Sequence, residues 1–415
     1  MEDIVTTRLS CGATLVCERI VGVRSAALRI LLPVGDASDP ADLDGRATLW
    51  SELLLRGSAE HDSRSQADAF DRLGASRSCS NGRRFVSFGT TALGERLGDV
   101  IPLVADSLLR PAFGEASVEA AKALAVQAIE SLEDDPQQRT AVAARRRHFA
   151  APLNRSGYGD ADHIGAATAE RLRTEWHESA KPGGAVISAA GAVDPESLRA
   201  ALDDAFASWE GDCASVEASG EPERGYGHIE DESNQVQVMV VHDAPAERDD
   251  AAFAERMLST VLSGGMSCRL FTEVREKRGL CYHVSARYKP EREFGSVTAY
   301  VGTTPERAQE ALDVLVAELR RVSEAGGEIT EDEYARAKTG LKSSVVFSGE
   351  STAARASALA SDMIKIGRAR SIGDLTDAIE AVTLEGLRSY AAGRDLGRLT
   401  VQTLGPGALN PPTGM

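Results

Sequence analysis

The stretch LSGGMSCRLFTEVREKRGLCYHVSARY, residues 262–288, is the part of the sequence that decides the fold. Near its start, the glycine pair Gly264–Gly265 is typical of a helix end followed by a turn. Its last residues, 282–288, alternate in a way that predicts a β-strand. Arg275 lies between these two features, and Tyr282, seven residues later, begins the predicted strand. The stretch therefore predicts a helix end, a turn and a strand in succession.

The segments on both sides extend this pattern over the second half of the chain. A strand is predicted at 234–242 and a helix at 250–262, directly before the quoted stretch. A further strand at 295–302 and several helices follow it. The half closes on a strand at 398–405 and on a tail, GPGALNPPTGM, that we expect to be disordered.

The first half shows the same order of elements. Residues 4–19 alternate around a Cys-Gly-Ala turn and predict a β-hairpin. Three further strands are predicted, at 24–35, 83–93 and 183–193. Helices are predicted at 45–57, 96–110, 117–133 and 195–208.

Two halves of similar length that mix strands with helices indicate a duplicated architecture. We expect an α+β protein made of two homologous α/β-sandwich halves, in which antiparallel-type sheets are flanked by helices. The expected domains are residues 1–210 and 234–415. The segment 211–233 is rich in Gly, Ser and Glu and contains Pro222, so it is the expected linker.

The composition is that of a soluble globular protein. With Lys+Arg 46 and Asp+Glu 63, the net charge is −17, which argues against nucleic acid as a partner. No apolar run approaches the roughly 20 residues of a membrane span, and the N-terminus has no export signal. The six cysteines show no CxxC spacing, which favours reduced thiols. We expect a cytoplasmic protein.

Several common catalytic motifs are absent from the sequence. It contains no glycine-rich phosphate-binding motif, and its seven histidines include no HxxH or HxxxH pair. The run 264–269 has Arg269 where a nucleophile elbow needs its second glycine. His148 ends an arginine-rich run, and we expect it to cap a basic helix end rather than to bind a ligand.

Three segments together resemble the pitrilysin/insulinase family, the inverted-zincin metallopeptidases of peptidase family M16, in its short two-chain type. The stretch 262–288 is similar to the S-x-R-L-F and R-E-x-x-G-L-x-Y-x-V signature of the family's C-terminal half. Residues 45–58 align with the motif G-x-A-H-x-x-E-H-x-x-F-x-G-T, and residues 128–136 with E-I-x-x-x-x-D-x-P. The resemblance covers nearly the whole chain.

The resemblance implies a zinc site that this chain has lost. In H-x-x-E-H two imidazoles bind zinc and the glutamate takes a proton from the metal-bound water, while a downstream glutamate is the third ligand. The corresponding positions hold Thr48, Ser51, Glu52 and Ala128. Only Glu52 could bind a metal, and one carboxylate does not hold zinc. We therefore expect no metal on this chain and zinc on a partner chain.

The second half keeps the residues that the resemblance assigns to the substrate. Arg275 and Tyr282 match the family's paired arginine and tyrosine, which contact the substrate carbonyl and stabilise the oxyanion. The alternative interpretation is a surface ion pair for Arg275 and a half-buried strand residue for Tyr282. Gly264 and Gly265 are either a flexible lip over a peptide channel or an ordinary helix end.

These features favour a non-catalytic subunit of a heterodimeric zinc metallopeptidase. A homologous partner chain would carry HxxEH, and this chain would contribute Arg275 and Tyr282 to peptide binding. The alternative is a non-enzymatic peptide-binding or scaffold homodimer, because family members serve as structural subunits of respiratory complexes. A third hypothesis, a hydrolase based on Cys281 or Cys268, lacks a histidine placed to activate either thiol.

Overall fold

The structure is a computed structural model, and it describes residues 3–413 and Met415. The chain divides into two compact units. Unit 1 consists of the residues up to Ser131 together with Ala151–Ser219 and Ser348–Ser371. Unit 2 consists of Leu132–Ala150, Gly220–Phe347 and Ile372–Met415. Each unit therefore contains a short segment from the other half of the sequence.

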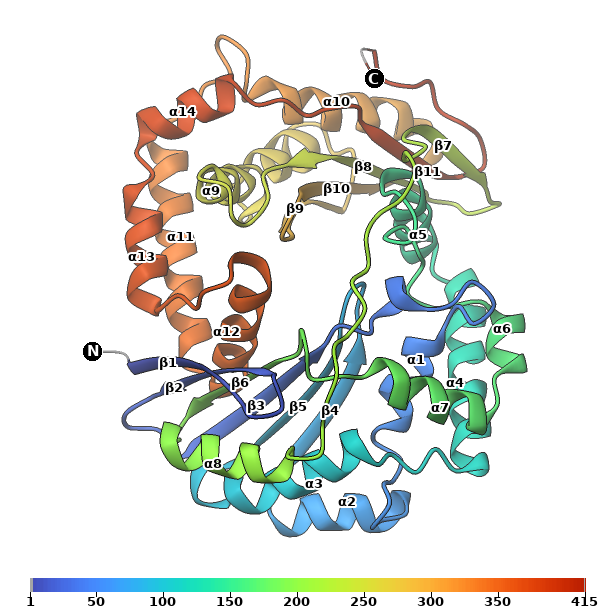
Figure 1. The fold of residues 1–415 in the computed structure, drawn as a ribbon. Helices are drawn as coiled ribbons and strands as arrows, with labels where there is room; N and C mark the ends of the chain where they lie inside the picture. Colours follow the sequence, from blue (N-terminus) through green and yellow to red (C-terminus); the bar gives the residue numbers. More distant parts are fainter. Residues whose placement is uncertain (1–2, 414) are drawn as a thin grey trace. The chain divides into compact units, whose positions relative to one another are not determined.

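Unit 1 is built on a six-stranded sheet with the order β1-β2-β6-β3-β5-β4 (Figure 1). Its neighbouring strands are antiparallel except for the parallel pair β2 and β6. The strands are β1 (Asp3–Arg8), β2 (Thr14–Arg19), β3 (Ser25–Leu32), β4 (Ser76–Asn81), β5 (Val86–Leu93) and β6 (Val186–Gly191).

Unit 2 repeats this sheet without its first strand. The order is β7-β11-β8-β10-β9, and β7 and β11 form the parallel pair. The strands are β7 (Gly225–Glu230), β8 (Val236–Ala244), β9 (His283–Pro290), β10 (Gly295–Thr303) and β11 (Thr400–Gly405). The same strand order with the parallel pair at the same place confirms the predicted α+β duplication, although both sheets are mixed rather than wholly antiparallel.

One face of the first sheet carries the main core of unit 1. Ala26, Leu28 and Ile30 alternate along β3 and pack against helices that include α1, α3 and α7. The helices and helical turns of the unit are η1 (Asp36–Ser38), α1 (Arg46–Leu53), α2 (Ser63–Arg72), η2 (Gly94–Arg96), α3 (Leu97–Leu109), α4 (Glu115–Glu133, which ends in unit 2), α6 (Ala161–Ala166), α7 (Ala169–Ser179), α8 (Pro195–Ala205) and α12 (Thr352–Ile366).

On the other face of this sheet, α12, which comes from the C-terminal half of the chain, covers mainly β6, β3 and β2 (Figure 1). Leu359 of α12 packs in a small core with Val16 and Ala27, which face away from the main core. The fully buried Arg355 of α12 also pairs with Glu18 of β2 and donates to the Arg370 carbonyl. An apolar contact and a buried ion pair thus hold α12 on the sheet.

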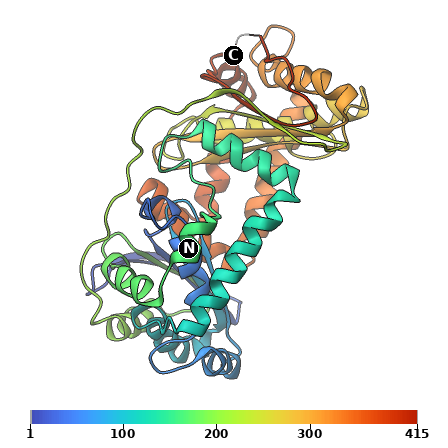
Figure 2. The ribbon, with the colours of Figure 1, turned by 90° about the vertical axis from the view of Figure 1, so that its right-hand side faces the viewer.

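Unit 2 is arranged in the same way. Val238 and Val240 of β8 face a core that includes α9 and α10, and the alternating residue Met239 faces Ala144 of α5. Figure 2 shows α10 and α5 on opposite faces of this sheet. The helices and helical turns of the unit are α5 (Pro136–His148), α9 (Ala252–Ser263), the π-helix η3 (Phe271–Glu276), η4 (Pro305–Arg307), α10 (Ala308–Arg321), α11 (Glu331–Gly349, which ends in unit 1), α13 (Ile372–Ala381) and α14 (Leu384–Ala392).

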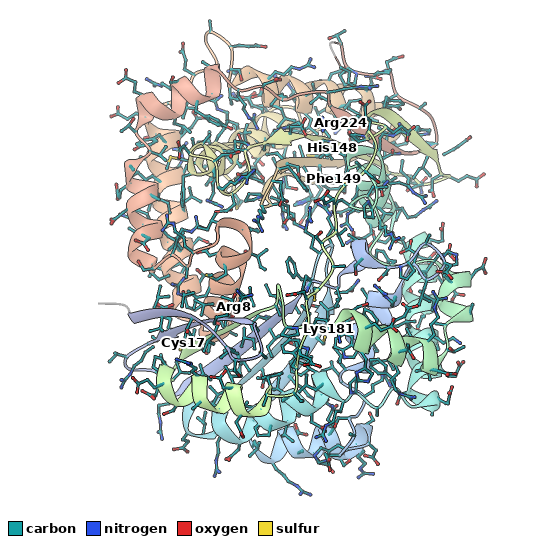
Figure 3. The ribbon with its side chains drawn as sticks, viewed as in Figure 1. Arg8, Cys17, His148, Phe149, Lys181 and Arg224 are labelled. Atoms are coloured by element: carbon teal, nitrogen blue, oxygen red, sulfur yellow. The ribbon has the colours of Figure 1, made fainter. Side chains whose placement is uncertain are left out.

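A polar cluster fastens α5 to the second sheet. Arg224 donates two hydrogen bonds to Asp243, of 2.5 and 2.8 Å, and Nε2 of His148 lies 3.6 Å from the same carboxylate. His148 is buried and its Nδ1 is 3.0 Å from the Thr400 hydroxyl. Figure 3 labels Arg224, His148 and Phe149 in this cluster. His148 is the last residue of its helix, and it joins the helix to β11.

The structure differs from the sequence-based expectations in three places. Strand β4 was not predicted, because its alternation is between polar residues of different exposure. Residues 225–230, inside the segment 211–233 expected to be a linker, form strand β7 through parallel pairing with β11. Part of the tail expected to be disordered is held in place, since the Leu409 N–H donates to the Tyr226 hydroxyl at 2.7 Å, while Gly414 lies outside the described residues.

No helix among the described residues is long and apolar enough to cross a membrane.

We predict that the Glu18–Arg355 pair is strongly coupled. Arg355→Met removes the buried guanidinium that pairs with the Glu18 carboxylate and should cost about 3–5 kcal/mol of unfolding free energy. Combining it with Glu18→Leu should cost less than the sum of the two single substitutions, as measured by urea unfolding. Arg199→Met, which removes an exposed ion pair with Asp203, is the control and should cost less than about 1 kcal/mol. Additive losses would contradict the coupling.

Candidate functional site

Helix α1 carries Thr48, Ser51 and Glu52, which the sequence comparison with H-x-x-E-H aligned with a zinc site, and its first turn is held by Asp39. The buried Asp39 carboxylate accepts the N–H groups of Gly45, at 3.0 Å, and Ala47, at 3.1 Å. Burial raises the pKa of Asp39 to about 7, although these N–H groups and the Arg46 guanidinium favour its ionised form. Gly45 has φ 111°, a conformation that favours glycine.

The side chains of Thr48 and Ser51 are engaged in local hydrogen bonds. The Thr48 hydroxyl donates to the Gly157 carbonyl at 3.3 Å and accepts from the Asn81 amide at 3.2 Å. Ser51 is 9% exposed, and its hydroxyl donates to the Thr48 carbonyl at 2.9 Å. These bonds satisfy both hydroxyls without any ligand, so the two residues serve the packing of α1.

Glu52 is paired within its own helix. Its carboxylate lies 2.5 Å from Nη2 and 2.8 Å from Nε of Arg56, one turn further along the chain. A metal would have to compete with this guanidinium for the same oxygen. Arg56 was not considered as a site residue in the sequence, although its i, i+4 spacing from Glu52 is a recognisable signal.

Ala128, which the sequence resemblance aligned with the third ligand, is exposed on α4. Its neighbour Ile129 packs against the core of unit 1, and Glu130 is exposed. The methyl group of Ala128 offers no metal-binding atom.

The residues at these four positions do not fit a zinc ion. Zinc sites use three or four nitrogen, sulfur or carboxylate ligands, and this set offers one carboxylate that is already paired with a guanidinium. Among residues 3–413 and Met415, no three His, Cys, Asp or Glu side chains gather so that they could hold a metal ion. No catalytic step on α1 follows from this donor set.

We predict that tight zinc binding needs a carboxylate at position 128 in addition to the three substitutions on α1. The variant Thr48→His/Ser51→Glu/Glu52→His/Ala128→Glu should bind zinc at least about tenfold more tightly than the variant that keeps Ala128. The reason is that even a second-shell partner contributes about 10–100-fold to metal affinity. Zinc competition titration against a chelator measures the difference. Equal affinities would show that Ala128 is not the third position.

Arg275 lies in unit 2, in the π-helix η3. The π-helical geometry is marked by the Lys277 N–H, which donates to the Thr272 carbonyl at 2.9 Å. The Arg275 guanidinium stacks between two rings, 4.6 Å from the centroid of Phe271 and 4.7 Å from that of Tyr282. Its nearest acid is Glu276, at 3.9 Å. Stacking thus orients the guanidinium and leaves its N–H groups available as donors.

Tyr282 directly precedes strand β9 and is 83% exposed. It is therefore more exposed than the half-buried strand residue of the alternative interpretation, although the Arg275 guanidinium lies over its ring. The structure therefore brings together Arg275 and Tyr282, which are seven residues apart in the sequence. Together they present a cation and a phenol at one exposed place.

The glycine pair follows α9 and lines a small pocket. Gly264 is the C-cap residue of α9. A side chain at Gly264 would meet the Thr260 carbonyl oxygen, 2.4 Å from an added Cβ. A cavity of about 210 Å³ lies between this loop and α11, lined by Thr260, Val261, Gly264, Gly265, Met266, Ser267, Cys268, Glu333, Arg336, Ala337 and Gly340. Met266 is 76% exposed at the loop tip.

Arg269 anchors this loop, a role that the sequence analysis missed. Its guanidinium contacts Glu333 through Nε, at 2.6 Å, and Nη2, at 2.9 Å, and it also donates to the Gly327 carbonyl at 2.7 Å. Thr330 and Glu333 form a capping box at the start of α11, because each accepts the backbone N–H of the other. The spacing of Thr330 and Glu333 was the available signal.

We predict that Glu333 stabilises the fold in a pH-dependent way. Burial alone would raise the pKa of Glu333, but hydrogen bonds from Arg269 and the Thr330 N–H lower it below the usual value. The stabilisation is therefore present above the unfolded pKa of about 4.3 and is lost as the pH falls through the lower folded value.

Glu333→Gln should consequently lower the free energy of unfolding at neutral pH, and the difference from the unmodified chain should shrink on acidification. Urea unfolding at about pH 7 and about pH 3 measures it. Glu385→Gln, which changes an exposed residue, is the control. A difference that does not depend on pH would contradict the ionic role of Glu333.

The cysteine-based hypothesis receives no support from the structure. Burial raises the pKa of the Cys281 thiol to about 11, although Arg275 acts in the opposite direction. The thiol is therefore protonated at neutral pH and a poor nucleophile. The nearby His283 contacts the Tyr300 ring instead. All six cysteines are free.

Comparison with known proteins identifies two matching family models. The model described as insulinase (peptidase family M16) matches residues 15–157. The model described as peptidase M16 inactive domain matches residues 166–341. The first match contains the α1 positions and the second contains Arg275 and Tyr282.

Individual relatives match along almost the whole chain. A Streptomyces coelicolor protein named an uncharacterized zinc protease is 29% identical, over 96% of this chain and 89% of that protein. The crystal structure of a peptidase M16 inactive domain from Pseudomonas fluorescens has a TM-score of 0.85 at 22% identity, covering 99% of both chains. A chain of complex III2 from Candida albicans has a TM-score of 0.82 at 16% identity, covering 97% of this chain and 96% of that one. The two structures share the fold.

Proposed function

The chain belongs to the peptidase M16 (insulinase) family, and from this membership we propose that it is the non-catalytic subunit of a two-chain zinc metallopeptidase. A homologous partner would carry HxxEH and the zinc. This chain would supply Arg275 and Tyr282 for binding the peptide substrate.

The observation that carries the proposal is the contrast between the two sets of residues. The hydroxyl groups of Thr48 and Ser51 donate local hydrogen bonds, and Glu52 is paired with Arg56. Arg275 and Tyr282, in contrast, are stacked together with Tyr282 exposed. A chain that had lost all connection with peptide hydrolysis would have no reason to keep the second set while losing the first.

The chemistry of the pair suits a peptide carbonyl. A guanidinium and a phenol both donate hydrogen bonds, and such donors stabilise the negative charge that develops on a carbonyl oxygen during hydrolysis. Stacking between Phe271 and Tyr282 restricts the Arg275 side chain before substrate arrives. Less conformational freedom is then lost on binding, which favours the bound state.

The loop at Gly264 and Gly265 is a second candidate contact for the peptide. It leads from α9 into η3, the helix that carries Arg275, and the exposed Met266 stands at its tip. Arg269 anchors the base of this loop to α11. We assign it to substrate binding beside Arg275 and Tyr282.

We predict that peptidase activity requires both chains and depends on Arg275 and Tyr282. The chain purified alone should not cleave peptides, and activity should appear when it is combined with its HxxEH partner, identified by co-purification from the native host. In that complex Arg275→Ala or Tyr282→Phe should lower kcat by about 10²-fold, the effect of removing one oxyanion donor.

Arg292→Ala is the matched control, since Arg292 is exposed in the turn between β9 and β10. Unchanged turnover in both site variants would reject their role. Recovery of a self-associated chain with no HxxEH partner, and without peptidase activity, would favour the scaffold homodimer.

A further inference from the structure

An uncovered polar surface lies on the first sheet beside α12. Helix α12 contacts mainly β6, β3 and β2, while β4 forms the edge of the sheet (Figure 1). The β4 residues on this face are Ser76, Ser78 and Ser80, and all three are exposed. Their partners on β5 are Thr91, Gly89 and Ser87. We call these six residues the serine face.

Arg29 of β3 lies over the centre of the serine face. It is paired across the sheet with Gly89, which is paired in turn with Ser78. A Cβ added at Gly89 would lie 3.1 Å from the Arg29 guanidinium carbon, so the absent side chain of Gly89 provides the room for it. Nη1 donates to the Ser87 hydroxyl at 3.1 Å, and Nε donates to Ser357 of α12 at 3.2 Å. Two hydroxyls therefore hold the guanidinium in place.

This guanidinium has no carboxylate partner among residues 3–413 and Met415. Its Nη2 group donates to no atom of the described chain. Burial lowers the pKa of Arg29 from its usual value, yet an arginine remains protonated at neutral pH. A partly buried cation that is held only by neutral hydroxyls favours an anion from outside the chain.

We propose that Arg29 and the serine face bind an acidic side chain, Asp or Glu, of a peptide. This inference rests on the proposed role in peptide binding and adds a substrate class to it. The carboxylate accepts hydrogen bonds from Arg29, and the serine hydroxyls supply further donors beside it.

The extent of the serine face favours a side chain over a peptide C-terminus. Polar residues continue on both sides of Arg29, with the pair Ser80–Ser87 on one side and Ser76–Thr91 on the other. A peptide can therefore pass over Arg29 in both directions, whereas a terminal carboxylate would leave one side unused.

The net charge makes the expected preference easy to recognise. The chain carries −17, so its overall field repels acidic peptides. Enrichment of acidic residues among bound peptides would therefore report a local cation rather than the average surface.

The test is the capture of a random decapeptide library by the immobilised full-length chain, followed by sequencing of the bound peptides. The unmodified chain should enrich Asp and Glu, and Arg29→Gln should abolish the enrichment. Replacing Glu by Gln in the most enriched peptide should weaken its binding by about tenfold or more, the effect of losing a charged hydrogen bond. Arg64→Gln, which removes one exposed cation from α2, should keep the preference.

A second variant guards against misfolding of Arg29→Gln. Ser87→Asp places a carboxylate beside Nη1 and should abolish the acidic preference while Arg29 remains. The inference would be overturned if the peptides captured by the unmodified chain and by both variants had the same content of acidic residues. It would also be overturned if no peptides were captured. A failure of the two-chain peptidase proposal would give a different result. The complex with the HxxEH partner would then lack peptidase activity, while the chain would still prefer acidic peptides.

Discussion

The structure depends on the burial of the apolar residues on both faces of each sheet. One face of each packs on helices of its own half of the sequence, but the other face needs a helix from the opposite half, α12 in unit 1 and α5 in unit 2. Without α12, Val16 and Ala27 would be exposed to water, and burial of such apolar surface is the main favourable term in folding. The Glu18–Arg355 pair adds a constraint, because neither charge can remain buried alone.

This arrangement explains why the polar features on the two sheets differ. In unit 2 the alternating residues Met239 and Val241 are apolar and pack on α5. In unit 1, α12 leaves the edge strand β4 uncovered, and the residues there are serines grouped around Arg29. The duplicated sheet thus supports an apolar contact in one unit and a polar, solvent-reachable surface in the other.

The same duplication separates two kinds of site. The positions on α1 that align with a zinc site have become part of the local packing, through the hydrogen bonds of Thr48 and Ser51 and the pairing of Glu52 with Arg56. In unit 2 the π-helix η3 sets Arg275 between two aromatic rings and leaves Tyr282 exposed. The proposed absence of metal binding in one unit is therefore compatible with the proposed peptide-binding role of Arg275 and Tyr282 in the other.

Much of the local structure followed from the sequence alone. Apolar alternation and helical spacing predicted strands such as β3, β8 and β10, and the motif around Arg275 and Tyr282 identified the family. Strands β4 and β7 and the exchange of α5 and α12 were decided only by the tertiary structure. The physical reason is that these features depend on partners far away in the sequence. They are a polar edge strand, the parallel pairing between β7 and β11, and the packing of a helix from one half of the sequence on the sheet of the other half. The stacking of Arg275 and the isolation of Arg29 from any carboxylate of the described chain likewise arise from side chains brought together by the fold.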